Sequence, residues 1–326
     1  MQVATVLGTV DSTDLGQTLM HEHISSADWA LRMNLGDRYY RHQEVADRAV
    51  AQFRRAREVG VRTVLDGTPP SIGRDVALIR EVAERSGVNF IASSGFYFHE
   101  ETYLRWGNSD GLYELLSSEC ADGIGSTGIR AGAMKAACAD HGVTPTLERG
   151  FSVIGRVAAE QGVPVFVHHH PSEGDGQTIC DIFEASGASS DQLILGHAGD
   201  SNDLDYLEGL LARGCYLGLD RFGYATMPKA SNGLAERIAT LAELCRRGFS
   251  SQLLLSHDLA TFVGLSLDWQ EFADGPEFPD VDFTFIHRTV LPLAQEAGVD
   301  ADTLRSILAD NPRRIFEAAA LRRSAA

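Results

Sequence analysis

Histidines at the ends of predicted strands suggest the chemistry of this chain. Four of its eleven histidines end short apolar runs: His21, His23, His168 and His197. His21 and His23 are two residues apart, so on a strand their side chains point the same way. Asp258 ends a further apolar run and adds a carboxylate. Each histidine alone could be a hydrogen-bonded structural residue, but together these nitrogen and oxygen ligands indicate a hydrolytic metal site, which activates bound water.

A lysine stands where another buried strand is expected to end. Lys135 follows the wholly apolar residues 131–134. A charged amine in such surroundings must be paired, lie in a polar site or be chemically altered. The alternative is that its flexible stem carries the amine out to solvent or to an acid. The residues alone leave both interpretations open.

The elements that must position these side chains repeat as an apolar run, a turn and an amphipathic helix. Eight runs are continuously apolar, as strands buried on both faces of a parallel sheet should be. They lie at 18–20, 62–66, 89–92, 131–134, 163–167, 192–195, 215–219 and 252–255. Helical periodicity marks 45–59, 75–85, 147–161, 204–212 and 234–247.

Eight β–α repeats predict a (β/α)8 TIM barrel, an α/β fold whose active sites lie at the C-terminal ends of the strands. We expect one barrel domain over residues 1–326. A doubly wound open sheet is the alternative. That fold prefers a glycine-rich phosphate turn after its first strand, whereas residues 20–23 read Met-His-Glu-His.

Composition narrows the partners. With 28 Lys and Arg against 45 Asp and Glu, the net charge is −17, which argues against nucleic acid because phosphate contacts need clustered basic residues. No apolar stretch approaches the roughly 20 residues of a membrane span, and a secretory signal is not expected. The five widely spaced cysteines predict free thiols in a reducing cytoplasm. We therefore expect a cytoplasmic protein that acts on a small molecule, with no membrane partner.

The C-terminal part is expected to combine a long loop with helices. Residues 258–282 are rich in Phe, Asp, Pro and Gly, and a loop of this length is uncommon unless it covers a site. A helix is expected over 285–297. The pair Asn311-Pro312 should divide 303–320 into two short helices, because the residue before a proline disfavours the helical conformation.

Six ordered motifs resemble those of the phosphotriesterase family of the amidohydrolase superfamily, and in particular its phosphotriesterase-like lactonases. They are Gly16-Gln17-Thr18-Leu19-Met20-His21-Glu22-His23, Gly128-Ile129-Arg130-Ala131-Gly132-Ala133-Met134-Lys135, Pro164-Val165-Phe166-Val167-His168, Leu195-Gly196-His197-Ala198-Gly199-Asp200, Gly218-Leu219-Asp220-Arg221-Phe222-Gly223 and Leu255-Ser256-His257-Asp258. The closing Asp310-Asn311-Pro312-Arg313-Arg314-Ile315-Phe316 is similar as well. The likeness covers nearly the whole chain.

The resemblance implies a site with two divalent metal ions. One ion would be held by His21, His23 and Asp258, and the other by His168 and His197. Zinc is the expected metal, with cobalt, manganese or iron as alternatives that suit the same ligands. Homodimers are usual in the resembled family, so a homodimer is expected.

The resemblance also gives the lysine a role. Lys135 would be carboxylated by carbon dioxide, and the resulting carbamate would bridge the two ions. A hydroxide between the ions would attack the carbonyl carbon, and Asp258 would pass a proton to the leaving oxygen. Tyr97 would direct its hydroxyl at the carbonyl or at the bridging hydroxide, and Arg221 would shape and close the pocket. Alternatively, Tyr97 is an aromatic wall residue and Arg221 forms an ion pair, for example with Asp220.

Four further histidines lie near these positions without an assigned catalytic role. His169 should point away from the site, and it departs from the small hydroxyl residue usual in the lactonases. His170 and His99 could reach the loop face, where either could donate a proton. His257 should face the side opposite to Asp258, as a supporting residue.

The loops at the strand ends are expected to choose the substrate. Their apolar side chains could line a pocket or form a dimer surface. They are Trp29, Met33, Tyr39, Tyr40, Phe98, Tyr103, Leu104, Trp106, Phe262, Leu265, Leu267, Trp269, Phe272 and Phe278. The leading function is hydrolysis of lactones or carboxylic esters, N-acyl-homoserine lactones among them. Phosphotriester cleavage is an expected side activity, because tetrahedral phosphorus resembles the tetrahedral intermediate at a carbonyl. The alternatives are an amidase for N-acyl substrates, a dedicated phosphotriesterase and a non-catalytic binding barrel.

Overall fold

Eight parallel strands form the centre of the molecule. The computed structural model describes residues 1–138, 140–224, 232–267, 269–272 and 281–323. Successive strands pair in parallel from the first to the eighth. The strands are β3 (Gln17–Ala27), β4 (Val61–Asp66), β5 (Asn89–Gly95), β6 (Ala133–Ala137), β7 (Val165–His168), β8 (Leu193–Gly196), β9 (Tyr216–Leu219) and β10 (Leu253–Leu255). Each of the eight predicted runs is therefore a strand, and the TIM-barrel prediction is confirmed.

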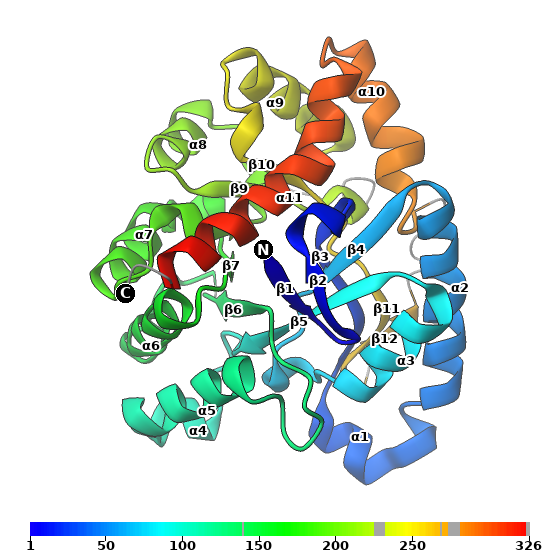
Figure 1. Cartoon of the computed structure of the whole chain (residues 1–326), viewed down its shortest axis with the longest axis vertical. Coiled ribbons are helices and arrows are strands. Elements are labelled where there is room, and N and C mark those ends of the chain that lie inside the picture. Colours follow the sequence, from blue (N-terminus) through cyan, green and yellow to red (C-terminus); the bar gives the residue numbers. More distant parts are fainter. Residues whose placement is uncertain (139, 225–231, 268, 273–280, 324–326) are drawn as a thin grey trace.

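Helices surround these strands, as Figure 1 shows. The five helices predicted from periodicity are all present, each within a few residues of the expected bounds. The helices are α1 (Trp29–Leu35), α2 (His42–Glu58), α3 (Val76–Ser86), α4 (Thr102–Trp106), α5 (Ser109–Ala121), α6 (Pro145–Gln161), α7 (Gly176–Ala185), α8 (Leu204–Leu211), α9 (Leu234–Arg246), α10 (Leu291–Glu296) and α11 (Ala301–Arg323). Local signals set their ends: Asp75 caps α3 by accepting from the Leu78 N–H, and Gly87 ends it with a left-handed φ of 72°.

The barrel is closed by the segment that follows β10. The Asp258 N–H donates to the His21 carbonyl at 3.1 Å, and the His23 N–H donates to the Leu259 carbonyl at 2.8 Å. The chain then forms β11 (Ala260–Ser266), which pairs in parallel with the C-terminal half of β3. β12 (Trp269–Phe272) returns antiparallel to β11. The last strand and the first are thus joined at the rim where the histidines lie.

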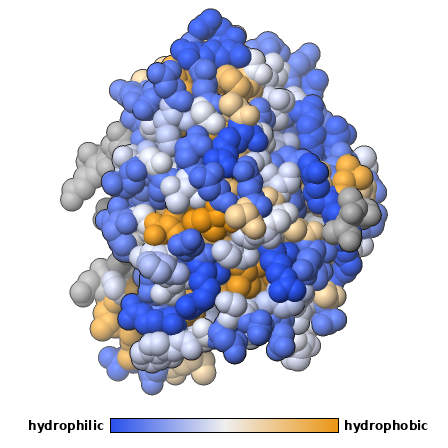
Figure 2. Space-filling model, turned by 90° about the vertical axis from the view of Figure 1, so that its left-hand side faces the viewer, coloured by the Kyte–Doolittle hydropathy of each residue, from blue (hydrophilic) through white to orange (hydrophobic). Residues whose placement is uncertain are grey.

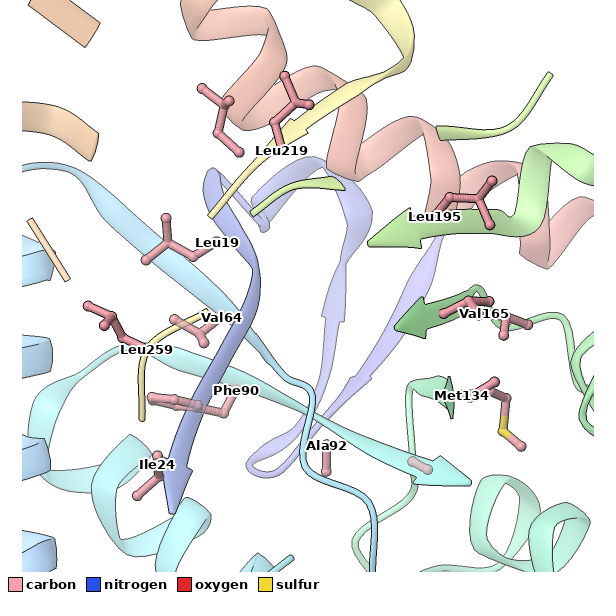
Figure 3. Packing of buried hydrophobic residues seen from close by; sticks show 14 of the residues in the cluster. Leu19, Ile24, Val64, Phe90, Ala92, Met134, Val165, Leu195, Leu219 and Leu259 are labelled. Atoms are coloured by element: carbon pink, nitrogen blue, oxygen red, sulfur yellow. The ribbon is translucent and has the colours of Figure 1, made fainter. Parts of the chain in front are cut away.

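Both faces of the barrel strands are buried, which explains their continuous apolar runs. One layer of inward-facing side chains takes a single residue from each strand: Met20, Leu65, Ile91, Ala133, Phe166, Ile194, Tyr216 and Leu254. The alternate residues pack outward beneath the helices, among them Leu19, Val64 and Leu195 in Figure 3. The side of the molecule in Figure 2 is mostly polar, and its apolar residues form small separate patches.

The end of the barrel away from the site is covered by an element that the sequence did not predict. The hairpin of β1 (Gln2–Thr5) and β2 (Gly8–Asp11) lies with α11 across the end that faces the viewer in Figure 1. Val3 of this hairpin joins Ile315 and Phe316 of α11 against the inward-facing layer. The hairpin therefore acts as a lid on the barrel core.

Two predictions for the C-terminal part are wrong. The expected loop over 258–282 contains β11 and β12, because its Phe262 and Val263 are buried against β3; residues 268 and 273–280 lie outside the described residues. The expected break at Pro312 does not occur: α11 continues through this residue. Asn311 anchors this point by donating to the Ser250 and Leu253 carbonyls, both at 2.7 Å, and burial of its neighbours outweighs the one missing helix hydrogen bond.

The helix expected over 285–297 is present, as a π-helical turn (Ile286–Val290) followed by α10. All five cysteines are free, and four of them are buried. The described part of the chain contains no helix that is both long and apolar enough to cross a bilayer.

Candidate active site

The predicted site residues meet at the C-terminal ends of the barrel strands. Their positions along the strands follow from the inward-facing layer. Lys135 and His168 each stand two residues after the layer residue of their own strand, Ala133 and Phe166, so alternation points both into the barrel. Both are buried, at 1% and 5% exposed.

His21 needs an irregular backbone to reach the same space. It directly follows Met20, which already faces inward, so regular alternation would turn His21 outward. The pairing of β3 with β4 shifts register between Leu19 and Glu22, and such a bulge re-aims a side chain. The His21 ring consequently packs on Phe166, with ring centroids 4.1 Å apart. Gly67 makes room for it, because a Cβ there would lie 2.6 Å from His21 Cδ2.

His197 and Asp258 are turned inward by backbone of an unusual kind. Their φ angles are 61° and 57°, in the left-handed region that residues other than glycine seldom adopt. Both stand just after the ends of β8 and β10. Strained backbone of this kind persists where the surrounding structure holds it, often at functional sites.

One group of ligand atoms is formed by His21, His23 and Asp258. Asp258 Oδ1 lies 3.4 Å from His21 Nε2 and 3.3 Å from His23 Nε2. These three residues form one of two groups in the described structure that could hold a metal ion; the other is His21, His197 and Asp220. The first ligand set predicted from the resemblance is thus brought together by the fold.

A second pair of imidazoles adjoins the first. His197 Nε2 lies 2.8 Å from His168 Nδ1, and the Tyr97 hydroxyl lies 3.2 Å from that same Nδ1. Tyr97 follows β5, two strands away from the β7 strand that carries His168. Burial, helped by the Asp258 carboxylate, raises the pKa of Tyr97, so this hydroxyl keeps its proton and can donate a hydrogen bond.

Lys135 lies beside His21 of the first group. Its Nζ is 2.9 Å from His21 Nε2 and 4.4 Å from the Phe166 ring centroid. No ion pair joins Lys135 to an acid in the described part of the chain, and its side chain does not reach solvent. Burial lowers the pKa of Lys135 to about 8. The structure therefore contradicts the alternative of a solvent-reaching or acid-paired lysine.

Asp220 orients a histidine of each group, a role that the sequence analysis missed. Asp220 Oδ2 accepts from His21 Nδ1, and Oδ1 accepts from His197 Nδ1, both at 3.0 Å. The Oδ1 atom also accepts the His197 N–H at 2.8 Å. With Nδ1 committed as the donor, Nε2 of each ring carries a lone pair directed into the site. The sequence did contain a signal for this role: Asp220 is a carboxylate at the end of β9, just as Asp258 is a carboxylate at the end of a predicted strand.

His23 is held in the same manner by the loop after β4. Thr68 Oγ1 lies 2.7 Å from His23 Nδ1. Asp66 at the end of β4 accepts the Thr68 N–H at 3.0 Å and the Ile24 N–H at 3.0 Å. This arrangement leaves His23 Nε2 facing Asp258.

Arg221 forms ion pairs, but not with its neighbour Asp220. Its Nε donates to Asp258 Oδ2 at 3.2 Å and its Nη1 donates to Asp200 Oδ2 at 2.6 Å. Arg237 donates to the other oxygen of Asp200 at 2.5 Å. The alternative that Arg221 forms an ion pair is therefore confirmed, with Asp258 and Asp200 as its partners and not the neighbouring Asp220 given as an example.

The charges around Asp258 decide its ionisation. Burial alone would raise its pKa, but His21, His197, the hydrogen bond to His23 and Arg221 outweigh burial and hold it well below its usual range. Burial also lowers the pKa of His21, His168 and His197, so these imidazoles are neutral at pH 7. Neutral imidazoles and an ionised carboxylate are the forms that bind metals.

The other histidines fall into place around this centre. His257 faces away from the site as predicted, with Nδ1 2.6 Å from Glu22 Oε1 and Nε2 accepting the Ile286 N–H at 3.1 Å. His169 is fully buried with Nδ1 2.5 Å from the Gly196 carbonyl. His170 is half-buried, with its ring 5.2 Å from that of His168, and His99 is exposed on the loop beside Tyr97.

The apolar loop residues divide between core and surface. Tyr39, Tyr40, Leu104 and Phe262 are buried, so they form loop cores. Others are exposed at the surface: Trp29, Met33, Tyr103, Trp106 and Leu267. The side chain of Trp269, like Phe278, lies outside the described residues.

Comparisons with known proteins agree with this geometry. The model of the phosphotriesterase family matches residues 1–316. A phosphotriesterase homology protein of Mycobacterium tuberculosis (strain ATCC 25618 / H37Rv) is 32% identical, with 97% of this chain and 98% of the relative covered. A solved structure of the phosphotriesterase from that species is similar over 98% of this chain and 99% of its own, with a TM-score of 0.89 and 30% identity.

Two further relatives carry different activities in their names. The aryldialkylphosphatase of Saccharolobus solfataricus is 27% identical, with 94% of this chain and 97% of the relative covered. The N-acetyltaurine hydrolase of Salmo salar is 24% identical, with 96% and 97% covered. The names of these two relatives thus describe hydrolysis at different kinds of bond.

Proposed function

The chain belongs to the phosphotriesterase family and is therefore a hydrolase, metal-dependent in that family, and we propose that it cleaves lactones and related carboxylic esters. N-acyl-homoserine lactones are one candidate substrate, and phosphotriesters are a side substrate. The observation that carries the proposal is the Tyr97 hydroxyl, 3.2 Å from His168 Nδ1, which can donate to a carbonyl oxygen placed over the ligand groups. In this proposal the whole 326-residue chain acts as one catalytic domain.

The donor set fits two divalent metal ions. His21, His23 and Asp258 would hold one ion, and His168 and His197 the other. The fit rests on Nε2 lone pairs that Asp220 and Thr68 direct inward, and on neutral imidazoles beside an ionised carboxylate. When bound, such ions lower the pKa of water to about 7 and polarise the substrate's carbonyl or phosphoryl oxygen. Zinc suits these ligands, as do cobalt, manganese and iron.

We propose that Lys135 carries a carbamate. A buried ammonium 2.9 Å from an imidazole nitrogen, without an acidic partner among the described residues, is costly. Its lowered pKa leaves much of the amine neutral at pH 8, which is the form that reacts with carbon dioxide. A carbamate would replace this cation with anionic oxygen ligands for both ions.

The chain's own residues supply the proton transfers and the positioning. Asp258 takes a proton from the attacking water and returns it to the leaving oxygen. Arg221 holds Asp258 as a carboxylate through the Nε hydrogen bond but keeps its own proton, so it positions the base without relaying the proton. Tyr97 donates to the substrate oxygen on which negative charge develops.

Amide hydrolysis is the second candidate. The relative named N-acetyltaurine hydrolase supports it, because that name describes cleavage of an N-acyl bond. Amide nitrogen is a poorer leaving group than a lactone oxygen and needs a proton donor. His170, half-buried and close to His168, is the residue placed to act as that proton donor.

A homodimer and a cytoplasmic location stay predictions.

A substrate screen tests the proposal. Protein loaded with zinc, cobalt or manganese is offered γ- and δ-lactones, acyl-homoserine lactones, N-acyl amino compounds and one activated phosphotriester at matched concentrations. The proposal expects the highest kcat/KM for lactones, lost on chelation and recovered with metal. The chelation step separates metal-dependent turnover from background hydrolysis. Dominant amide cleavage would establish the second candidate instead.

A further inference from the structure

We infer that Glu22 is a positioning residue that fixes the Asp258 segment against β3 and so sets the geometry of the His21–His23–Asp258 group. The inference rests on the proposed function for the two-metal site that the experiment titrates. Its metal-binding readout stands apart from any choice of substrate. Glu22 lies between two proposed ligands in the chain, yet its carboxylate contacts neither of them.

The Glu22 carboxylate is fully buried. It accepts hydrogen bonds from the residues that follow β10. Oε1 accepts from Ser256 Oγ at 2.7 Å, from the His257 N–H at 2.8 Å and from His257 Nδ1 at 2.6 Å. Oε2 accepts the Leu259 N–H at 3.0 Å. Every one of these donors belongs to the segment from Ser256 to Leu259 that carries Asp258. A carboxylate without a cationic partner is normally exposed, so this burial indicates a specific structural demand.

Two hydrogen bonds that involve the His21 backbone, one in each direction, complete the clasp. The His21 N–H donates to Ser256 Oγ at 2.9 Å, and the Asp258 N–H donates to the His21 carbonyl at 3.1 Å. Ser256 Oγ therefore links the Glu22 carboxylate directly to the backbone of His21. In this way one side chain connects the first ligand-bearing strand to the last.

The need for this clasp follows from the backbone of the segment. β10 ends at Leu255, and β11 begins at Ala260, so residues 256–259 lie between two strands and are not part of either. Asp258 has a left-handed φ of 57°, which is uncommon for residues other than glycine, although aspartate adopts it more often than most. Glu22 supplies acceptors to the residues on both sides of Asp258. Without them Asp258 could relax and move away from His21 and His23.

The chemistry requires a carboxylate at this position. Its two oxygens offer about four acceptor sites and no donor, which matches four donors. Glutamine has the same shape, but its amide N–H2 would face a donor from His257 or Leu259. Glu22→Gln is therefore nearly isosteric and specifically breaks the clasp. Glu119 gives a matched control, because it is also buried and its carboxylate accepts hydrogen bonds from Arg74 and Ser94. Neither of these partners is a proposed metal ligand.

The experiment measures the affinity of each metal equivalent. Wild type, Glu22→Gln and Glu119→Gln, each first stripped with a chelator, are titrated with zinc against a chromophoric chelator, and the cobalt-loaded forms give visible spectra. We expect Glu22→Gln to weaken one of two zinc equivalents by about 10- to 100-fold, the range for lost support of a metal ligand. The other equivalent should change less than about threefold, and the cobalt spectrum should change in shape. Glu119→Gln should melt at a lower temperature but keep both affinities.

The outcomes separate this inference from the proposed function. Wild-type affinity for both zinc equivalents in Glu22→Gln, with an unaltered cobalt spectrum, would overturn the positioning role. Equal losses in Glu22→Gln and Glu119→Gln would also overturn it, since general destabilisation would then explain both. If Glu22→Gln does not fold, Ser256→Ala removes the link to His21, and it must show the same one-site loss. If these shifts occur while wild type cleaves none of the lactones, the proposed function fails and the positioning role stands.

Discussion

Arg221 donates through Nε to Oδ2 of Asp258 at 3.2 Å, so the proposed base of this site is in contact with a permanent cation. The second arm of Arg221 is fixed by Asp200, which Arg237 also holds. Asp258 is therefore kept ionised by a chain of charged groups that extends outward from the barrel. An arginine in that chain can stabilise the carboxylate but cannot carry its proton away.

Replacing Arg221 should therefore move the pH profile. In Arg221→Gln the Asp258 carboxylate loses a cation that lowers its pKa, so that pKa rises toward its ordinary value. Activity that needs the ionised form is lost as pH falls through this pKa, so the acid limb of kcat/KM should shift to higher pH. At pH 7, where Asp258 stays ionised in both proteins, the change through this pKa should be small, so the acid limb carries the test. Arg247→Gln, which breaks only exposed ion pairs, is the control. An unshifted acid limb would show that Arg221 does not act on Asp258.

Asp220→Asn should weaken the binding of both metal ions. Asp220 accepts from Nδ1 of His21 in one group and of His197 in the other. An asparagine can accept from one ring only, so the second loses its orientation, and we expect affinities about 10- to 100-fold lower. Metal content after dialysis against a zinc buffer measures the effect. Thr68→Val, which touches only His23, should weaken a single ion. A loss confined to one ion in Asp220→Asn would contradict the bridging role.

Lys135 should capture carbon dioxide in its neutral form. Burial lowers its pKa to about 8, so the neutral fraction grows as pH rises through that value. Incubation of stripped protein with zinc and ¹³C-bicarbonate should give a carbamate NMR signal that increases between pH 7 and pH 9. Lys135→Ala should lose the signal, the metals and the activity together. Full activity with two bound metals in Lys135→Ala would exclude a bridging lysine.

His287 should make the fold sensitive to mild acid. Burial lowers its pKa from 6.5 to about 4, while its Nε2 contacts Gln17 Oε1 at 2.8 Å. The unfolded chain takes up the proton first, so this stability is present above pH 6.5 and is lost as pH falls toward 4. Between pH 7.5 and pH 5 the loss is about 2 kcal/mol, at 1.36 kcal/mol per pH unit. Urea unfolding of wild type and His287→Gln at both pH values tests this expectation: parallel losses in the two proteins would remove His287 as the cause.

The order of strands and the strand-end positions of the polar side chains could be predicted because both depend on local pattern. A strand buried on both faces must be continuously apolar, and a polar residue that ends such a run must lie at the rim. His168 and Lys135 illustrate this, since each lies two residues beyond an inward-facing side chain. The β1–β2 hairpin and β11 escaped prediction because their sequences are short or mixed with turn residues. The break predicted at Pro312 was wrong because burial of α11 stabilises the helix more than proline destabilises it.

By itself the sequence determined the barrel, the rim and the types of side chain that occupy it. Only the tertiary structure decided which groups orient the ligands: Asp220 for His21 and His197, Asp258 rather than Asp220 for Arg221, and Ser256 to Leu259 for Glu22. The physical reason is that a hydrogen bond depends on distance and direction between two atoms. Glu22 and Ser256 are 234 residues apart in the chain, and they become neighbours only when the eighth strand closes on the first.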